Sequence, residues 1–213
     1  IGPVRYLDAE VKRDIENLKR AVTETGAEEA FLSAASPGIL AFQITNRHYK
    51  SYEDYLQAFS DAMRAEYEAI AEAGLIVQVD APDLPCAAPQ HSDMCPPDIM
   101  EKYGLRGVIE LHLEAIENAT ARIPSDQFRL HLCWGNYEAS HHYDIPLQEV
   151  LEPVLRKSHA GAVLFESANP RHEHEWEIFE QMKVPEDKIF IPGIIDTLTN
   201  FVEHPRTVSQ RIQ

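Results

Sequence analysis

Apolar and polar positions alternate with two different periods along the chain, and this predicts its secondary structure. After Asp8 the apolar residues keep helical spacing as far as Gly26, and a second helical stripe runs from Ser51 to Gly74. Short apolar runs typical of buried strands are found at 1–7, 30–35, 75–80, 128–134, 161–167 and 189–195. Further helices are expected at 107–122, 147–158, 172–182 and 205–213, and Ser36-Pro37-Gly38 is typical of a turn.

Strands that alternate with helices in this way predict a parallel sheet with right-handed crossovers. Either an open α/β sheet or a (β/α)8 barrel fits the alternation. A barrel typically needs about 250 residues, so a chain of 213 residues falls one or two units short. Neither glycine-rich phosphate-binding motif of the nucleotide-binding folds occurs, and no linker divides the chain. We therefore expect one domain over residues 1–213.

Polar residues gather where the expected strands end, at Asp80, His131, Cys133, Glu166 and Asp196. The carboxyl ends of parallel strands meet at one edge of a sheet, and in a barrel this edge forms the active-site face. Asp196 is more readily explained as a capping residue. The other four residues predict a functional site at this edge.

His131 and Cys133 stand two residues apart, so they point to the same side of their strand. With the Glu166 carboxylate from the next strand, they offer the mixed nitrogen, sulfur and oxygen ligands that zinc accepts. The alternative interpretation is a buried, hydrogen-bonded His131 beside a Cys133 that fills space in the core.

Three further groups of residues have both a functional and an ordinary interpretation. Asp80 shares a strand face with Gln78, where a carboxylate could hold a substrate ammonium, form a salt bridge or cap a helix. The spacing of Cys86, His91 and Cys95 is looser than that of a zinc knuckle, so an ordinary surface loop is expected. His172 and His174 are expected in a solvated first helical turn, or else behind the metal ligands.

Composition excludes some partners. The 19 basic and 35 acidic residues give a net charge of −16, which disfavours a nucleic acid or an anionic membrane as the main partner. No apolar run is long enough for a membrane span, and no basic segment followed by an apolar one opens the chain. Three cysteines do not suggest a disulfide framework, so a reducing cytoplasm is the expected location.

The sequence resembles the catalytic barrel of cobalamin-independent methionine synthases over most of its length. The motifs that carry the resemblance are Phe31-Leu-Ser-Ala-Ala-Ser-Pro-Gly38, Val77-Gln-Val-Asp-Ala-Pro-Asp-Leu84, His131-Leu-Cys-Trp-Gly135 and Phe165-Glu-Ser-Ala-Asn-Pro-Arg-His-Glu-His174. Each motif alone is weak, but their order and spacing together are specific.

The resemblance implies a (β/α)8 barrel of the methionine synthase and uroporphyrinogen decarboxylase type. It implies zinc bound by His131, Cys133 and Glu166 and methyl transfer from methyltetrahydrofolate to a thiol such as homocysteine. Asp80, with Gln78 beside it, matches the position that holds the amino group of homocysteine.

The chain also departs from the family pattern. No cysteine follows Cys133, whereas the family's last zinc ligand is a second cysteine on the final strand, and the opening strand is also absent. An internal piece lacking the first and last strand units is therefore expected. Two alternatives remain: a catalytically silent barrel fragment that pairs with another copy through its strand edges, or a zinc-dependent transferase that uses a thiol such as coenzyme M to open an epoxide.

Overall fold

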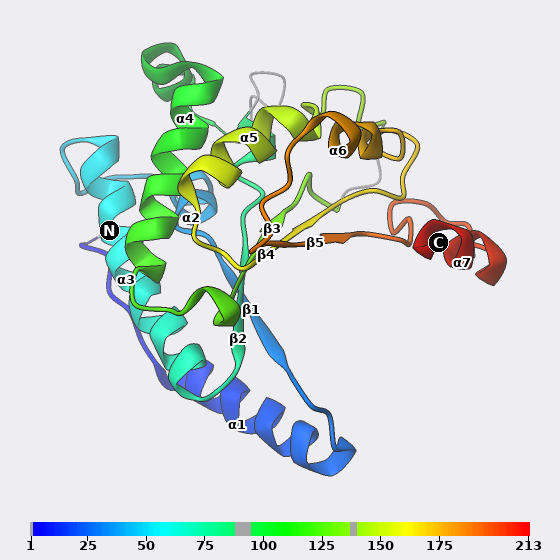
Figure 1. The fold of residues 1–213 in the computed structure, drawn as a ribbon. Coiled ribbons are helices and arrows are strands. Elements are labelled where there is room, and N and C mark those ends of the chain that lie inside the picture. The colour runs from blue at the N-terminus through cyan, green and yellow to red at the C-terminus, as the bar shows by residue number, and fades with distance from the viewer. Residues whose placement is uncertain (1, 88–94, 137–139) are drawn as a thin grey trace.

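A single parallel sheet organises the fold. The computed structural model describes residues 2–87, 95–136 and 140–213. Its five strands lie side by side in chain order, each parallel to its neighbours (Figure 1). They are β1 (Phe31–Ala35), β2 (Ile76–Asp80), β3 (Phe128–Leu132), β4 (Ala162–Phe165) and β5 (Ile189–Pro192). The predicted α/β class with a parallel sheet is confirmed.

The described part of the expected strand at 1–7 is not a strand, so that prediction is wrong there. Residues 2–7 have no strand pairing, and the Val4 amide donates instead to the Tyr49 hydroxyl at 2.9 Å. Pro3 lacks the amide hydrogen that a sheet ladder needs, which disfavours pairing. The described strands therefore number five rather than six.

Most of the expected helices are present. The helices are α1 (Ala9–Thr25), α2 (Pro37–Gln43), α3 (Tyr52–Glu72), α4 (Pro97–Thr120), α5 (Leu147–Lys157), α6 (Ile178–Gln181) and α7 (Pro205–Ile212). Gly26 ends α1 in the left-handed conformation, with φ of 67°, and Ser51 caps α3 by accepting from the Asp54 amide at 3.1 Å. The sequence predicted both the end of α1 at Gly26 and the start of α3 at Ser51.

Three predicted elements differ in the structure. Ser36-Pro37-Gly38 begins α2 rather than a turn, because the Ser36 hydroxyl caps the Ile39 amide at 3.1 Å and proline suits a first helical position. α4 begins at Pro97 and bends at Gly104, where φ is 65°. The expected helix at 172–182 is reduced to α6, which follows a 3-10 turn at Glu175–Glu177.

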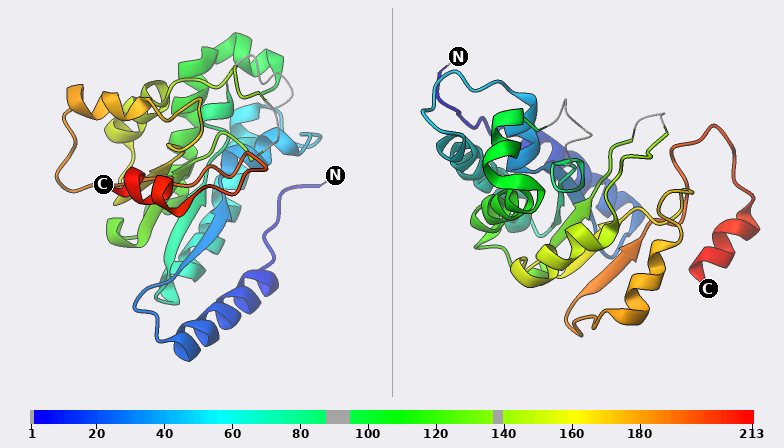
Figure 2. Two further views of the ribbon diagram at one scale, coloured as in Figure 1. Left: turned by 90° about the vertical axis from the view of Figure 1, so that its right-hand side faces the viewer. Right: turned by 90° about the horizontal axis from the view of Figure 1, so that it is seen from above.

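The main core lies between the sheet and helices packed on one of its faces. α3 and α4 pack against each other, with α2 and α5 beside them (Figures 1 and 2). Along β3, Phe128, Leu130 and Leu132 are fully buried, whereas Arg129 and His131 alternate with them and are half-buried. The side chains of β3 that do not enter the core are thus left to form a site on the opposite face.

The strands turn progressively across the sheet, from β2, upright in Figure 1, to β5, which runs across it. This rotation follows from the twist of every strand, and it curves the sheet as the wall of a barrel is curved. Among the described residues, none of the helices combines the length and the apolar composition that a bilayer span requires.

Candidate metal centre

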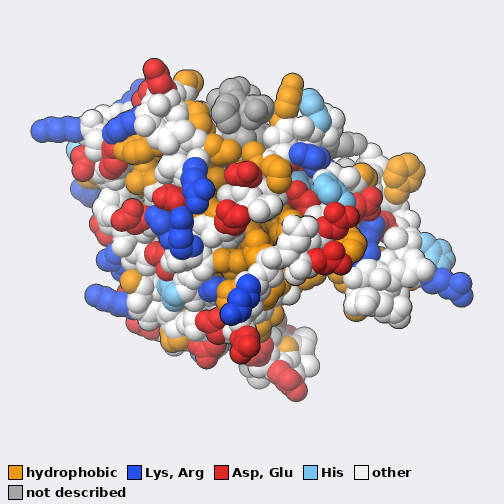
Figure 3. All heavy atoms as spheres, turned by 45° about the horizontal axis from the view of Figure 1, so that its top comes forward, with side chains coloured by type: hydrophobic (Ala, Val, Ile, Leu, Met, Phe, Trp, Pro, Cys, Tyr) orange, Lys and Arg blue, Asp and Glu red, His pale blue; other side chains and the backbone are white. Residues whose placement is uncertain are grey.

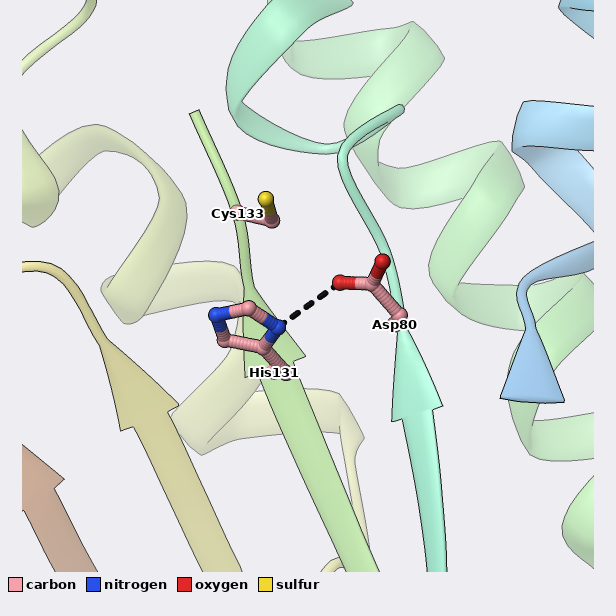
Figure 4. A group of neighbouring side chains, drawn as sticks. All are labelled: Asp80, His131 and Cys133. Atoms are coloured by element: carbon pink, nitrogen blue, oxygen red, sulfur yellow. Dashed lines mark ion pairs between the residues drawn. The ribbon is translucent and has the colours of Figure 1, made fainter. Parts of the chain in front are cut away.

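Asp80 and His131 meet at the carboxyl ends of β2 and β3. The two residues are register partners on adjacent parallel strands, so their side chains leave the sheet at the same level and on the same face. Asp80 Oδ1 lies 2.7 Å from His131 Nδ1 (Figure 4). Both side chains keep some exposure, 41% for Asp80 and 33% for His131. The pair is therefore accessible to a ligand that approaches this edge.

Cys133 joins this pair. It follows β3 by one residue, and its sulfur lies on the same side of the strand as the His131 ring (Figure 4). One ligand atom each from Asp80, His131 and Cys133 can be chosen so that all three lie within 4.8 Å of one another. One nitrogen, one sulfur and one oxygen donor at this spacing suit zinc, which binds all three and leaves further positions for a substrate in catalytic sites.

The charge around Cys133 also suits a cation. Burial raises the pKa of the Cys133 thiol to about 11, with further contributions from the carboxylates of Asp80 and Glu166. A hydrogen bond from the Gly135 amide to the sulfur, at 3.4 Å, acts in the opposite direction. At neutral pH the free thiol therefore keeps its proton. A divalent cation would replace that proton and relieve the unfavourable negative potential.

Glu166, predicted as the third ligand, lies near this group but outside it. It follows β4, and its Oε1 accepts hydrogen bonds from the amides of Ser167 at 3.0 Å and Ala168 at 2.9 Å. Both hydrogen bonds are made to Oε1, so they orient the carboxylate through one of its two oxygens. Asp80, predicted to hold a substrate, instead supplies the oxygen of the group that includes His131 and Cys133.

Gln78 lies on the same face of β2 as Asp80, as the sequence predicted. Its side chain is 8% exposed, and its Nε2 donates to the Ser33 hydroxyl on β1 at 3.2 Å. Its Oε1 has no hydrogen-bond partner within the described ranges. This acceptor could receive a hydrogen bond from a bound ligand, and its role in substrate binding stays a prediction.

A cavity of about 370 Å³ connects the carboxyl ends of the last three strands. His131, Cys133 and Glu166 all line it, together with Trp134, Asn169 and Gly193. On the face shown in Figure 3, histidine and acidic side chains lie beside an apolar strip. The structure thus brings the predicted ligands to one cavity.

The two cysteines of the 86–95 segment are buried, while residues 88–94 lie outside the described ranges, so the expected surface loop stays a prediction. Cys86 and Cys95 are each 4% exposed, and the Cys86 sulfur donates to the Cys133 carbonyl at 3.8 Å. Burial raises the pKa of Cys86 to about 12. His91 lies outside the described residues. Asp196 caps no helix, because α7 begins at Pro205 after His204; its Oδ1 instead accepts from the Leu198 amide at 2.9 Å within a loop.

His172 is buried rather than solvated, so the default prediction for this residue is wrong. Its side chain contacts Asp144 and Glu175 and packs against Trp134, whereas His174 is exposed as expected. The sequence signal was available: the carboxylate of Glu175 stands three residues after His172, a spacing that brings side chains together in a helical turn.

Comparison with known proteins finds similarity to solved structures alone. No family profile and no curated protein sequence matches the chain. A solved structure, the B12-independent methionine synthase from Shewanella sp. W3-18-1 in complex with selenomethionine, superposes with a TM-score of 0.68 at 19% identity. The match covers 97% of this chain and 54% of that one, so the chain spans about half the length of its relative. This likeness shows that the fold is shared with part of a methionine synthase barrel.

Proposed function

We propose that this chain carries the zinc site of a methionine-synthase-like transferase. The proposed reaction moves a methyl group from methyltetrahydrofolate to a thiol such as homocysteine. The observation that carries this proposal is the group of Asp80, His131 and Cys133, whose ligand atoms meet at the carboxyl edge of the sheet. The shared fold with a methionine synthase supports the same assignment.

In this proposal His131 and Cys133 hold zinc, and a carboxylate completes the protein ligands. The observed arrangement favours Asp80 for that position, because its carboxylate lies beside His131 and within the group that Glu166 does not join. When bound, zinc supplies stabilisation of the thiolate form of a substrate thiol that enters its open position. Whichever carboxylate does not bind the metal is available to hold the substrate's ammonium group, with Gln78 Oε1 as a further acceptor.

Metal binding is the first test. Protein purified without chelator and loaded with zinc should retain about one zinc per chain after extensive dialysis. Cys133→Ser should lose that zinc, while Cys95→Ser, which changes a buried cysteine outside the group, should retain it. A wild-type chain that retains no zinc would overturn the proposal.

The second test identifies the group that the protein transfers. Zinc-loaded protein is incubated with methyltetrahydrofolate and homocysteine, and methionine is measured by mass spectrometry. Methionine formation that requires Cys133 is the expected result. Opening of an epoxide by coenzyme M, with no methionine formed, would favour the other zinc-dependent transferase and reject methyl transfer.

A second candidate function rests on the two sheet edges. Within the described residues β1 pairs only with β2, and β5 pairs only with β4. Phe31 on β1 is 45% exposed and Ile189 on β5 is 65% exposed. Open strand edges with exposed apolar side chains favour pairing with another chain. The proposal is a catalytically silent barrel segment that associates with a second copy, and it predicts dimers without zinc retention.

A further inference from the structure

Four buried titratable side chains lie together beside the candidate metal centre. His141, Asp144, His172 and Glu175 are 6%, 2%, 1% and 7% exposed. Asp144 Oδ2 lies 2.7 Å from His141 Nδ1 and 3.1 Å from His172 Nε2. His172 Nδ1 lies 2.8 Å from Glu175 Oε2. None of these residues belongs to the proposed zinc ligands.

The two nitrogens of His172 determine its charge. Each faces a carboxylate oxygen, and an ionised carboxylate can only accept a hydrogen bond. Both nitrogens must then carry hydrogen, which makes the ring an imidazolium. Neutral imidazole would leave one unprotonated nitrogen against a buried carboxylate, an arrangement that costs free energy.

The directions of the pKa shifts of His172 and Asp144 are consistent with a positively charged His172 ring. Burial lowers the pKa of His172, but its hydrogen bonds to Asp144 and Glu175 outweigh burial, so the pKa is raised. Burial raises the pKa of Asp144, and hydrogen bonds from His172 and His141 outweigh that effect, so it is lowered. Two further polar groups at the cluster, among the described residues, are the Arg171 guanidinium, which donates to the Asp144 carbonyl at 2.8 Å, and the nearby Cys86 thiol.

The cluster supports the indole of Trp134. The ring centroids of Trp134 and His172 lie 4.5 Å apart, within the range of a cation–π contact. The indole Nε1 donates to the Ile145 carbonyl at 3.0 Å, and the side chain is 2% exposed. Trp134 directly follows Cys133 and lines the same cavity. A fixed Trp134 therefore restricts the backbone that carries the Cys133 sulfur.

The Glu175 carboxylate connects the cluster to helix α5. Glu175 Oε1 accepts from the amide of Leu147, the first residue of α5, at 3.1 Å. One glutamate thus binds both His172 and the amino end of α5, where the helix dipole favours a negative charge. The segments before α5 and α6 are held against the end of β3 through His172.

We propose that His172 is a positioning residue, held as an imidazolium, that fixes Trp134 and thereby orients Cys133 at the candidate metal centre. Its consequence for metal binding rests on the proposed function. Its charge and its contact with Trp134 do not, so the two parts can be tested separately.

The charge is tested in the folded protein without removing His172. Nitrogen-15 NMR of histidine-labelled protein at about pH 7.5, roughly one unit above the usual histidine pKa, should show a histidine with both ring nitrogens protonated. The sequence has two tryptophans, so Trp176→Phe leaves Trp134 as the only one. A contacting imidazolium quenches indole fluorescence, so emission should stay low through neutral pH and rise in alkaline solution. A neutral His172 tautomer at pH 7.5 would overturn the proposal.

The positioning role is tested by His172→Gln, with His174→Gln as an exposed control from the same segment. His172→Gln should abolish the alkaline rise in Trp134 emission and weaken zinc binding by roughly 10–100-fold, as loss of groups that support metal ligands does. His174→Gln should change neither. A folded His172→Gln protein with wild-type zinc affinity would reject positioning. If wild-type protein binds no zinc, the proposed function fails, while the NMR and fluorescence results still decide the charge.

Discussion

The His112 ring and the Asp83 carboxylate form a completely buried pair, with His112 Nδ1 2.8 Å from Asp83 Oδ2 and neither side chain exposed. The Ser36 hydroxyl donates to the other oxygen of Asp83, and the Tyr52 hydroxyl lies 2.7 Å from His112 Nε2. This chain of contacts joins the residues after β1 and β2 to α3 and α4. Ser36 and Asp83 follow the carboxyl ends of β1 and β2, and β2 ends at Asp80 of the candidate metal centre.

Breaking this pair should destabilise the fold strongly. Asp83→Ala removes the partner of both His112 and Ser36, and the loss of one member of a buried pair costs about 3–5 kcal/mol. The free energy of unfolding in urea measures the effect. Asp61→Ala, at a largely exposed position on α3, should stay within about 0.5 kcal/mol of wild type. Equal stability of the two variants would contradict the importance of the pair.

Gly38→Ala should also destabilise the protein, for a steric reason. A Cβ at residue 38 would overlap the Asp83 carboxylate and the His112 ring, whereas a Cβ at Gly2 would meet nothing within 4 Å. Overpacking of this kind costs about 1–3 kcal/mol. Thermal unfolding should therefore show a lowered midpoint for Gly38→Ala and an unchanged one for Gly2→Ala. A wild-type midpoint for Gly38→Ala would mean that the pair shifts freely.

The two carboxylates near Cys133 should differ in their effect on zinc. Asp80→Asn removes the charged oxygen nearest His131 and should lower zinc affinity at least about tenfold. Glu166→Gln should have a smaller effect, because its carboxylate lies outside the group of Asp80, His131 and Cys133. Competition with a chromogenic chelator measures both affinities. The opposite order would make Glu166 the metal ligand and leave Asp80 for the substrate.

The pH dependence of stability should reflect His172 and Asp144. A raised pKa of His172 contributes stability fully below its unfolded value, near 6.5, and this stability is lost as the pH rises through the folded pKa. A lowered pKa of Asp144 contributes stability above 3.8, which is lost as the pH falls through the folded pKa. His172→Gln should therefore flatten the alkaline decrease in the free energy of unfolding. An unchanged alkaline slope would contradict this linkage.

The open edge at β5 predicts self-association. Ile189→Lys places a charge on the exposed edge strand and should shift the protein toward monomers, because edge lysines disfavour strand pairing. Light scattering after size-exclusion chromatography measures the mass as a function of concentration. Leu7→Lys, also at an exposed apolar position but outside the sheet, is the matched control. A wild-type chain that stays monomeric at high concentration would reject the prediction.

Local patterns predicted much of this fold because they depend on residues near each other in the chain. Helical spacing located α1 and α3, and apolar runs located all five strands of the sheet. Ser36-Pro37-Gly38 was misread because a serine before a proline suits both a turn and a helix start. The hydrogen bond from Ile39 that decides between them becomes visible only in the structure.

The sequence by itself determined that His131 and Cys133 share a strand face, because alternation along a strand is a property of the backbone. Only the tertiary structure decided that Asp80 faces His131, since register between strands depends on packing across the whole sheet. The burial of His172 is likewise a tertiary result. Its polar partners come from segments about thirty residues apart, and only folding removes them from water together.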